Sequence, residues 1–120
     1  MNSQPKILLI DNASDRKERI KALSERGYSV FPALKMEEAR SRCMRGNYDL
    51  IVVHAGDQLE QAQEFCDALR TQCPKQLLLM SGMAASDRDY AVSAELSSLI
   101  QRVDRLLHGN EHRGDLASAA

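Results

Sequence analysis

The sequence predicts an α/β fold in which helices cover both faces of a parallel sheet. Short runs of consecutive apolar residues, such as residues 6–10 and 50–53, are typical of strands buried on both faces. These runs alternate with longer segments whose apolar residues recur at helical spacing. Short connections then favour parallel strands joined by right-handed crossovers. With 120 residues and 43% hydrophobic content, the chain can build one core of ordinary size.

The first strand, residues 6–10, is followed by an amphipathic helix that ends at Gly27. Asn12 or Ser14 can cap the start of this helix through a side-chain oxygen. Glycine at the other end favours a left-handed stop. The basic residues of the helix are expected on its solvent side: Arg16, Lys17, Arg19 and Lys21.

Residues 28–31 predict a second, shorter strand near an edge of the sheet. Pro32 favours the edge position because proline has no backbone N–H to donate to a neighbouring strand. A helix is expected over residues 35–45, with Gly46-Asn47 as a left-handed stop.

Residues 48–54 contain four consecutive apolar residues between turn-like and loop-like segments, which predicts a strand buried on both faces at the centre of the sheet. An amphipathic helix follows over residues 58–72 and cannot continue past Pro74. Residues 76–80 then predict a further buried strand, which is followed by Ser81. Ligands of open parallel sheets bind beyond the carboxyl ends of the strands, so these ends are where a site is expected.

The last elements are a short strand at residues 90–92 and a strongly amphipathic helix at residues 94–108. Gly109-Asn110 is expected to stop this helix. The prediction is therefore one domain over residues 1–109 and a flexible tail over residues 110–120.

The connection between the last two strands is unusually short. Only residues 82–89 are available, and a crossover that carries a helix needs about ten to twelve residues or more. Eight extended residues still span the length of a strand. A crossing without a helix would leave apolar sheet surface for another protein or a second copy. The candidate contact residues there are Met83, Asp87 and Tyr90.

Composition gives no reason to expect nucleic acid or membrane as a partner. Sixteen Lys and Arg against seventeen Asp and Glu leave a formal net charge of −1. No apolar run approaches the length of a membrane span. Cys43, Cys66 and Cys73 cannot all pair with one another, which favours free thiols in a reducing compartment. A cytoplasmic location is expected.

The order of these elements resembles the receiver domain of bacterial two-component response regulators, over about residues 6–107. The resemblance is carried by the strand-end strings at residues 7–11, 27–30, 48–53 and 78–81. It implies a doubly wound, CheY-like five-stranded parallel sheet in the order 2-1-3-4-5. The fourth helix of that family is expected to be missing or replaced by a loop.

The resemblance also implies a phosphorylation site that has lost most of the residues its reaction needs. In the family, an acidic pair after strand one and an aspartate ending strand three hold Mg²⁺, and that aspartate takes a phosphoryl group. A hydroxyl after strand four and a lysine after strand five contact the phosphoryl oxygens. Matched by position, these sites are Asp11 and Asn12, then His54, Ser81 and Ser93. Only the first acid and the hydroxyl agree with the family pattern.

These departures predict a pseudo-receiver that is not an enzyme. Mg²⁺ prefers hard oxygen ligands, so an imidazole and an amide in place of two carboxylates should abolish its binding, and no cofactor is expected. Function would then rest on protein binding, independent of phosphorylation. The expected partner is a protein of a two-component pathway, such as a histidine kinase docked at Arg16 and Lys17, or a second copy of the chain.

Two other functions stay open. A displaced phosphoacceptor, Asp57 or His54 itself, would keep the domain in a phosphorelay. Alternatively, His54 could sense pH, a metal or a small ligand in the altered pocket. Its structural interpretation is a neutral imidazole that fills the pocket and hydrogen-bonds Asp11 or Asn12. One histidine and one aspartate are too few ligands for a stable metal site.

Overall fold

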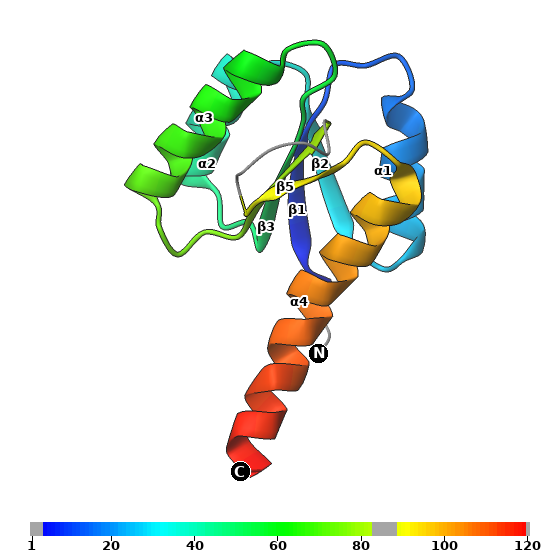
Figure 1. Ribbon diagram of the computed structural model, residues 1–120, viewed down its shortest axis with the longest axis vertical. Helices are drawn as coiled ribbons and strands as arrows, with labels where there is room; N and C mark the ends of the chain where they lie inside the picture. The colour runs from blue at the N-terminus through cyan, green and yellow to red at the C-terminus, as the bar shows by residue number, and fades with distance from the viewer. Residues whose placement is uncertain (1–3, 83–88, 120) are drawn as a thin grey trace.

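The computed structural model contains a five-stranded parallel sheet in the order β2-β1-β3-β4-β5 (Figure 1). It describes residues 4–82 and 89–119, with the side chains of residues 44 and 109–119 left aside. The predicted fold class and strand order are confirmed. The strands are β1 (Lys6–Ile10), β2 (Ser29–Ala33), β3 (Leu50–His54), β4 (Leu78–Gly82) and β5 (Ala91–Ser93).

Four helices in the described part of the chain cover the two faces of the sheet. They are α1 (Arg16–Glu25), α2 (Met36–Arg45), α3 (Leu59–Gln72) and α4 (Leu96–Ala119). One apolar cluster joins the sheet to α1 and α4 through Leu23, Leu99 and Val103. The other joins it to α2 and α3 through Ala39 and Phe65. The sheet is therefore buried on both sides, as its continuous apolar strands predicted.

The edge position of β2 is confirmed, although the strand is longer than predicted. It runs through Pro32 to Ala33, and Pro32 lies opposite Leu9 of β1. The carbonyl oxygen of Pro32 accepts a hydrogen bond from Arg42 Nη1 at 2.8 Å. Pro32 has no backbone N–H to donate, and its carbonyl oxygen already accepts from Arg42. This edge of the sheet is therefore poorly suited to pairing with another strand.

The predicted helix stops were partly wrong. Gly27 ends α1 at a positive φ of 94°, as expected. Gly46 follows α2 in an extended conformation, with φ −94° and ψ 161°, instead of a left-handed one. Helix α4 continues through the predicted stop at Gly109-Asn110 to Ala119 and extends away from the sheet (Figure 1). A glycine inside a helix costs only about 1 kcal/mol relative to alanine, so it need not end one. The flexible tail over residues 110–120 stays a prediction.

The sheet face between β4 and β5 was predicted to be bare, but its described residues are buried. Met80 is fully buried and Tyr90 is only 3% exposed. Tyr90 donates a hydrogen bond from its hydroxyl to Asp67 Oδ1 at 2.6 Å, and the Arg70 guanidinium lies 5.4 Å from its ring centroid. Tyr90 is therefore a core residue held by α3, and its assignment to an exposed contact surface was wrong.

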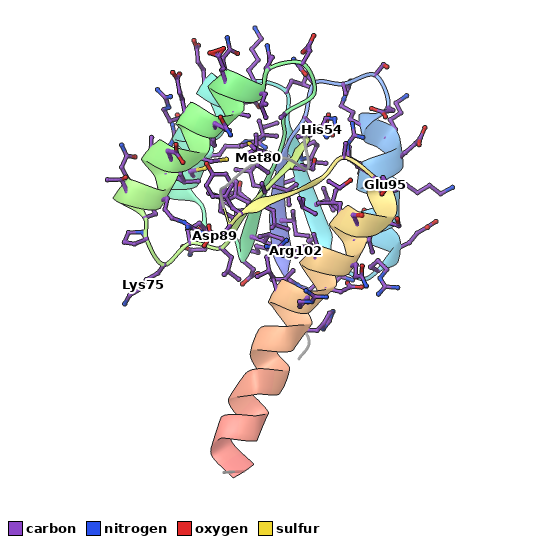
Figure 2. The ribbon with its side chains drawn as sticks, in the orientation of Figure 1. His54, Lys75, Met80, Asp89, Glu95 and Arg102 are labelled. Atoms are coloured by element: carbon purple, nitrogen blue, oxygen red, sulfur yellow. The ribbon has the colours of Figure 1, made fainter. Side chains whose placement is uncertain are left out.

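The remainder of the short crossing lies outside the described residues. Met83 and Asp87, both proposed as contact residues, fall in that segment. No helix is described between β4 and β5 on either side of it. Figure 2 labels Met80 on β4 and Asp89 just before β5. Within the described ranges, no helix is long and apolar enough to cross a membrane.

Candidate functional site

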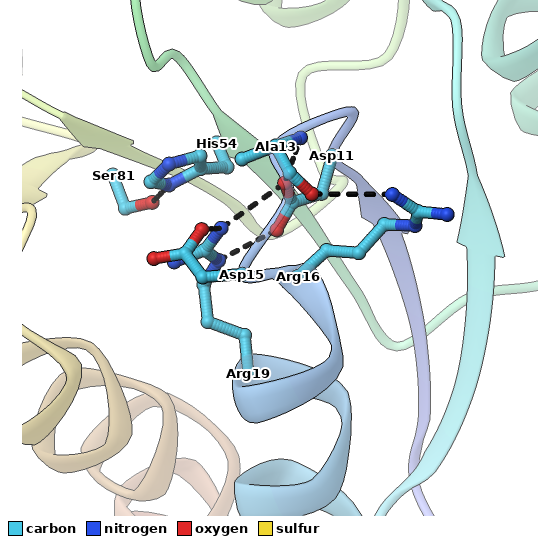
Figure 3. A network of polar contacts seen from close by, with 7 residues as sticks. All are labelled: Asp11, Ala13, Asp15, Arg16, Arg19, His54 and Ser81. Carbon is cyan, nitrogen blue, oxygen red and sulfur yellow. Dashed lines mark hydrogen bonds and ion pairs between the residues drawn. The ribbon is translucent and has the colours of Figure 1, made fainter.

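The carboxyl ends of β1, β3 and β4 bring three predicted site residues to one rim of the sheet (Figure 3). Asp11 directly follows β1, while His54 ends β3 and pairs in register with Ser81 of β4. Parallel strands present their carboxyl ends at the same edge, which is why residues so distant in sequence meet here.

A buried ion pair occupies the β1 side of the rim. Arg19 donates from Nε to Asp11 Oδ2 at 2.6 Å and from Nη2 to Asp11 Oδ1 at 3.2 Å. The Arg19 and Asp11 side chains are only 7% and 1% exposed. Arg19 was predicted on the solvent side of α1, and that was wrong. A guanidinium matches a carboxylate with two parallel hydrogen bonds, which favours its burial here over exposure to water.

The start of α1 is shaped around this pair. Asp11 Oδ1 also accepts a hydrogen bond from Ala13 N at 3.0 Å, which bends the chain towards the helix. Asp15 stands at the cap position without a side-chain cap hydrogen bond, so neither Asn12 nor Ser14 caps α1 as predicted. The Asp15 carboxylate instead accepts from Arg19 Nη2 at 2.7 Å, one helical turn away.

Charge in this cluster is fixed. Burial by itself lowers the pKa of Arg19, but the hydrogen bonds to Asp11 and Asp15 outweigh it and the net pKa is raised. The hydrogen bond from Arg19, followed by its positive charge, lowers the pKa of Asp15. Arg19 therefore stays a cation at every accessible pH.

The β3 and β4 side of the rim is neutral. His54 Nδ1 and Ser81 Oγ are 2.9 Å apart and share a hydrogen bond, whose direction depends on the imidazole tautomer. Burial, and then the charge of Arg19, lowers the pKa of His54. The neutral imidazole predicted from sequence agrees with this direction. Its hydrogen-bond partner is Ser81, however, and not Asp11 or Asn12.

The other predicted positions lie apart from this network. Ser93 ends β5, and its Oγ accepts a hydrogen bond from Glu95 N at 3.2 Å. Asn12 and Asp57 are both exposed. On α1, Lys17 is exposed, whereas Arg16 is half-buried and donates to the Ala13 carbonyl at 3.2 Å.

These residues do not fit a magnesium ion. Mg²⁺ requires oxygen ligands in octahedral geometry, and both carboxylate oxygens of Asp11 already accept hydrogen bonds from Arg19. The imidazole of His54 is a poor ligand for such a hard ion. Across the described residues, no group of three or more His, Cys, Asp or Glu side chains could hold a metal ion. Loss of Mg²⁺ binding stays a prediction.

Arg19 is the site residue that sequence reasoning missed. Its spacing from two neighbours could have revealed it. It lies four residues after Asp15, as in a helical ion pair, and four residues before the fully buried Leu23. The spacing to Leu23 places Arg19 on the inward face of α1, and the spacing from Asp15 supplies a partner for its charge. Positive charge alone suggested the opposite.

The sequence matches no protein-family model and no curated protein. Solved structures are nevertheless similar to it. A response regulator from Thermotoga maritima is 22% identical, with a TM-score of 0.69, and covers 88% of this chain and 99% of its own. The chemotaxis response regulator CheY4 of Vibrio cholerae is 19% identical, with a TM-score of 0.72, and covers 88% and 100%.

A third similar chain comes from the complex of the histidine kinase ThkA with the response regulator TrrA. It is 23% identical, with a TM-score of 0.71, and covers 87% of this chain and 99% of its own. At these identities the comparisons establish the fold. The chain has the receiver-domain fold that the strand-end strings predicted.

Proposed function

We propose that this chain is a cytoplasmic receiver-like domain that acts in signal transduction by binding a protein, without phosphoryl chemistry or enzymatic activity of its own. The observation that carries the proposal is the 2.9 Å hydrogen bond between His54 and Ser81. It ties together the two side chains that match the family's phosphoacceptor and its hydroxyl. The receiver-domain fold supports the pathway, and this bond supports the mechanism.

The phosphoacceptor of the receiver family is an aspartate, which attacks as an anionic carboxylate. His54 instead presents a half-buried imidazole whose lowered pKa favours the neutral form. Its Nδ1 is engaged by Ser81, which is 1% exposed. A phosphoryl group on Nδ1 would have to break that bond, and one on either ring nitrogen would enter a site without Mg²⁺ to neutralise its charge.

The surface that best suits a partner is the solvent side of α1. With Arg19 buried, the exposed basic residues on it are Lys17 and Lys21, beside the half-buried Arg16. Lys17 and Lys21 lie one helical turn apart and suit an acidic patch on a partner, while the exposed Glu18 and Glu25 leave the surface of α1 mixed in charge. A chain similar to this one was solved in the complex of the histidine kinase ThkA with the response regulator TrrA, so we propose a kinase or phosphotransfer helix as the partner. Pairing of two copies is the alternative.

Phosphorylation tests the mechanism. The wild-type protein, incubated with acetyl phosphate and MgCl₂, should keep its unmodified intact mass. A response regulator with a complete site, treated alongside, should gain one phosphoryl group. Stoichiometric labelling of the wild type would contradict the proposal. A labelled peptide that contains His54 or Asp57 would then assign the displaced acceptor.

Binding tests the surface. Purified histidine kinase and phosphotransfer domains from the source organism would be titrated against the wild type and the K17E/K21E variant. Charge reversal should weaken binding at low salt and leave folding unchanged. Lys75, which is exposed in the loop after α3 and far from α1, provides the matched control as K75E (Figure 2). Equal loss in both variants would contradict docking at α1, and sedimentation would detect pairing of two copies.

A role as a pH sensor near neutrality is less favoured. Burial and the charge of Arg19 both move the pKa of His54 below its ordinary value, away from neutral pH.

A further inference from the structure

We propose that the guanidinium of Arg19 is the permanent cation of this site and occupies the place beside Asp11 that a divalent metal would need. The inference rests on the proposed function in one respect, because it takes the site to work without a metal ion. It then explains which group balances the negative charge of Asp11. It concerns which cation pairs with Asp11, and its test measures metal binding instead of phosphorylation.

The first argument is the use of the Asp11 oxygens. Oδ2 accepts from Arg19 Nε at 2.6 Å, and Oδ1 accepts from both Arg19 Nη2 and Ala13 N. A carboxylate offers about four lone-pair sites on two oxygens, and three are taken. A divalent ion would have to displace the guanidinium and would be repelled by it until it left.

The second argument is burial. Charged side chains this deeply buried are rarely found unpaired, and separating them leaves an uncompensated charge in a low-dielectric environment. The Arg19 and Asp11 side chains are 7% and 1% exposed, so water offers little to either if the pair opens. Asp15, at 2.7 Å from Arg19 Nη2, holds the guanidinium from its solvent side.

The third argument is that this cation cannot be withdrawn. A bound metal leaves when its concentration falls, whereas Arg19 is part of α1 and its raised pKa keeps it charged. The pair fastens α1 to the carboxyl end of β1. The start of α1, which carries Lys17 two residues before Arg19, is thereby anchored to the rim whatever the supply of Mg²⁺ or phosphoryl donor.

The test compares metal binding with and without Arg19 in a background that restores the missing carboxylates. The background is N12D/H54D, and the test variant is N12D/H54D/R19Q. Calorimetric titration with MgCl₂, and thermal unfolding in MgCl₂ against EDTA, give two independent readings. The triple variant should bind Mg²⁺ at least about tenfold more tightly, because a unit charge at ion-pair distance changes binding by more than that.

Other outcomes are equally decisive. Stabilisation of the wild type by MgCl₂, or equal affinity in the double and triple variants, would overturn the proposal. A triple variant that folds but binds no Mg²⁺ would overturn it too, because Arg19 would then not be what excludes the ion. If the glutamine variant does not fold, N12D/H54D/R19M also removes the charge and keeps most of the side-chain volume. That variant should bind Mg²⁺ more tightly than N12D/H54D, and no gain would contradict the proposal.

The two proposals fail separately. Phosphorylation of the wild type without any response to MgCl₂ would refute the proposed function and leave Arg19 as the resident cation. A wild type that binds MgCl₂ but takes no phosphoryl group would do the reverse.

Discussion

The two sides of the rim are stabilised by different kinds of interaction. On the β1 side, Asp11 and Arg19 are both charged and satisfy each other through two hydrogen bonds. On the β3 and β4 side, His54 and Ser81 avoid charge and share one hydrogen bond. Within the described residues, no buried side-chain nitrogen or oxygen lacks a hydrogen-bond partner. Both sides therefore satisfy their described buried polar atoms with groups of the protein itself.

The comparison indicates where each side is vulnerable. A buried ion pair costs most when one partner is removed, because the other charge remains and has lost its hydration. A neutral hydrogen bond leaves behind only a polar atom, which costs about 1–3 kcal/mol when buried. The charged side should therefore control stability, and the neutral side should control the response to pH.

The largest effect is expected on the charged side. D11A removes the carboxylate and leaves Arg19 paired with Asp15 alone, so the free energy of unfolding should fall by about 3–5 kcal/mol. Urea unfolding measures it. D57A is the matched control, because Asp57 is an exposed aspartate in a nearby loop. A loss below about 1 kcal/mol in D11A would mean that the pair contributes no more than a surface ion pair.

A double variant sharpens the same point. D11A/R19M removes both charges and keeps most of the side-chain volume of Arg19 in the site. It should be more stable than D11A, because buried ion pairs are often replaced by apolar residues without loss. If the double variant were less stable than D11A, the cost would come from packing and not from an unpaired charge.

A smaller effect is expected on the neutral side. S81A leaves His54 Nδ1 without its hydroxyl partner, and the free energy of unfolding should fall by about 1–2 kcal/mol. S93A is the control, since Ser93 is a half-buried strand-end serine whose hydroxyl, within the described ranges, bonds Glu95 N of its own turn. Equal losses in the two variants would argue against any special role of the bond to His54.

The pH response should belong to His54. Its pKa is lowered on folding from an ordinary value of 6.5, by burial first and then by the charge of Arg19. Below about pH 6.5 the unfolded chain therefore binds more protons at this residue than the folded protein. The stability contributed by neutral His54 is fully present above that pH and is lost as the pH falls below it.

Unfolding measured over about pH 7.5 to 5, the range in which an ordinary histidine titrates, would show this dependence. H54Q should flatten the curve relative to the wild type. An unchanged curve in H54Q would assign the pH dependence to the other histidines.

The smallest effect is expected outside both sides of the rim. K17E changes an exposed residue of α1, and surface substitutions of this kind usually stay within about 0.5 kcal/mol. The variant should unfold like the wild type in urea while its binding to a kinase domain weakens. A large loss of stability would mean that the docking test at α1 cannot be separated from folding.

Much of the fold could be predicted because its signals are local. Consecutive apolar residues identified β1 and β3, Pro32 placed β2 at an edge, and Gly27 ended α1. Helix ends were less predictable, since Gly46 and Gly109 carry the same signal as Gly27 but do not adopt its conformation. Whether a glycine ends a helix depends on what packs beyond it.

The sequence by itself determined the α/β architecture and which residues stand at the strand ends, since spacing and hydrophobicity are properties of the chain. The strand order followed from the resemblance of its strand-end strings to receiver domains. Only the tertiary structure decided which of those residues meet. It buried Arg19 against Asp11, joined His54 to Ser81 and enclosed Tyr90 beneath α3. The physical reason is that a charged or polar side chain is buried only where a partner compensates its lost hydration, and the partner is supplied by the fold.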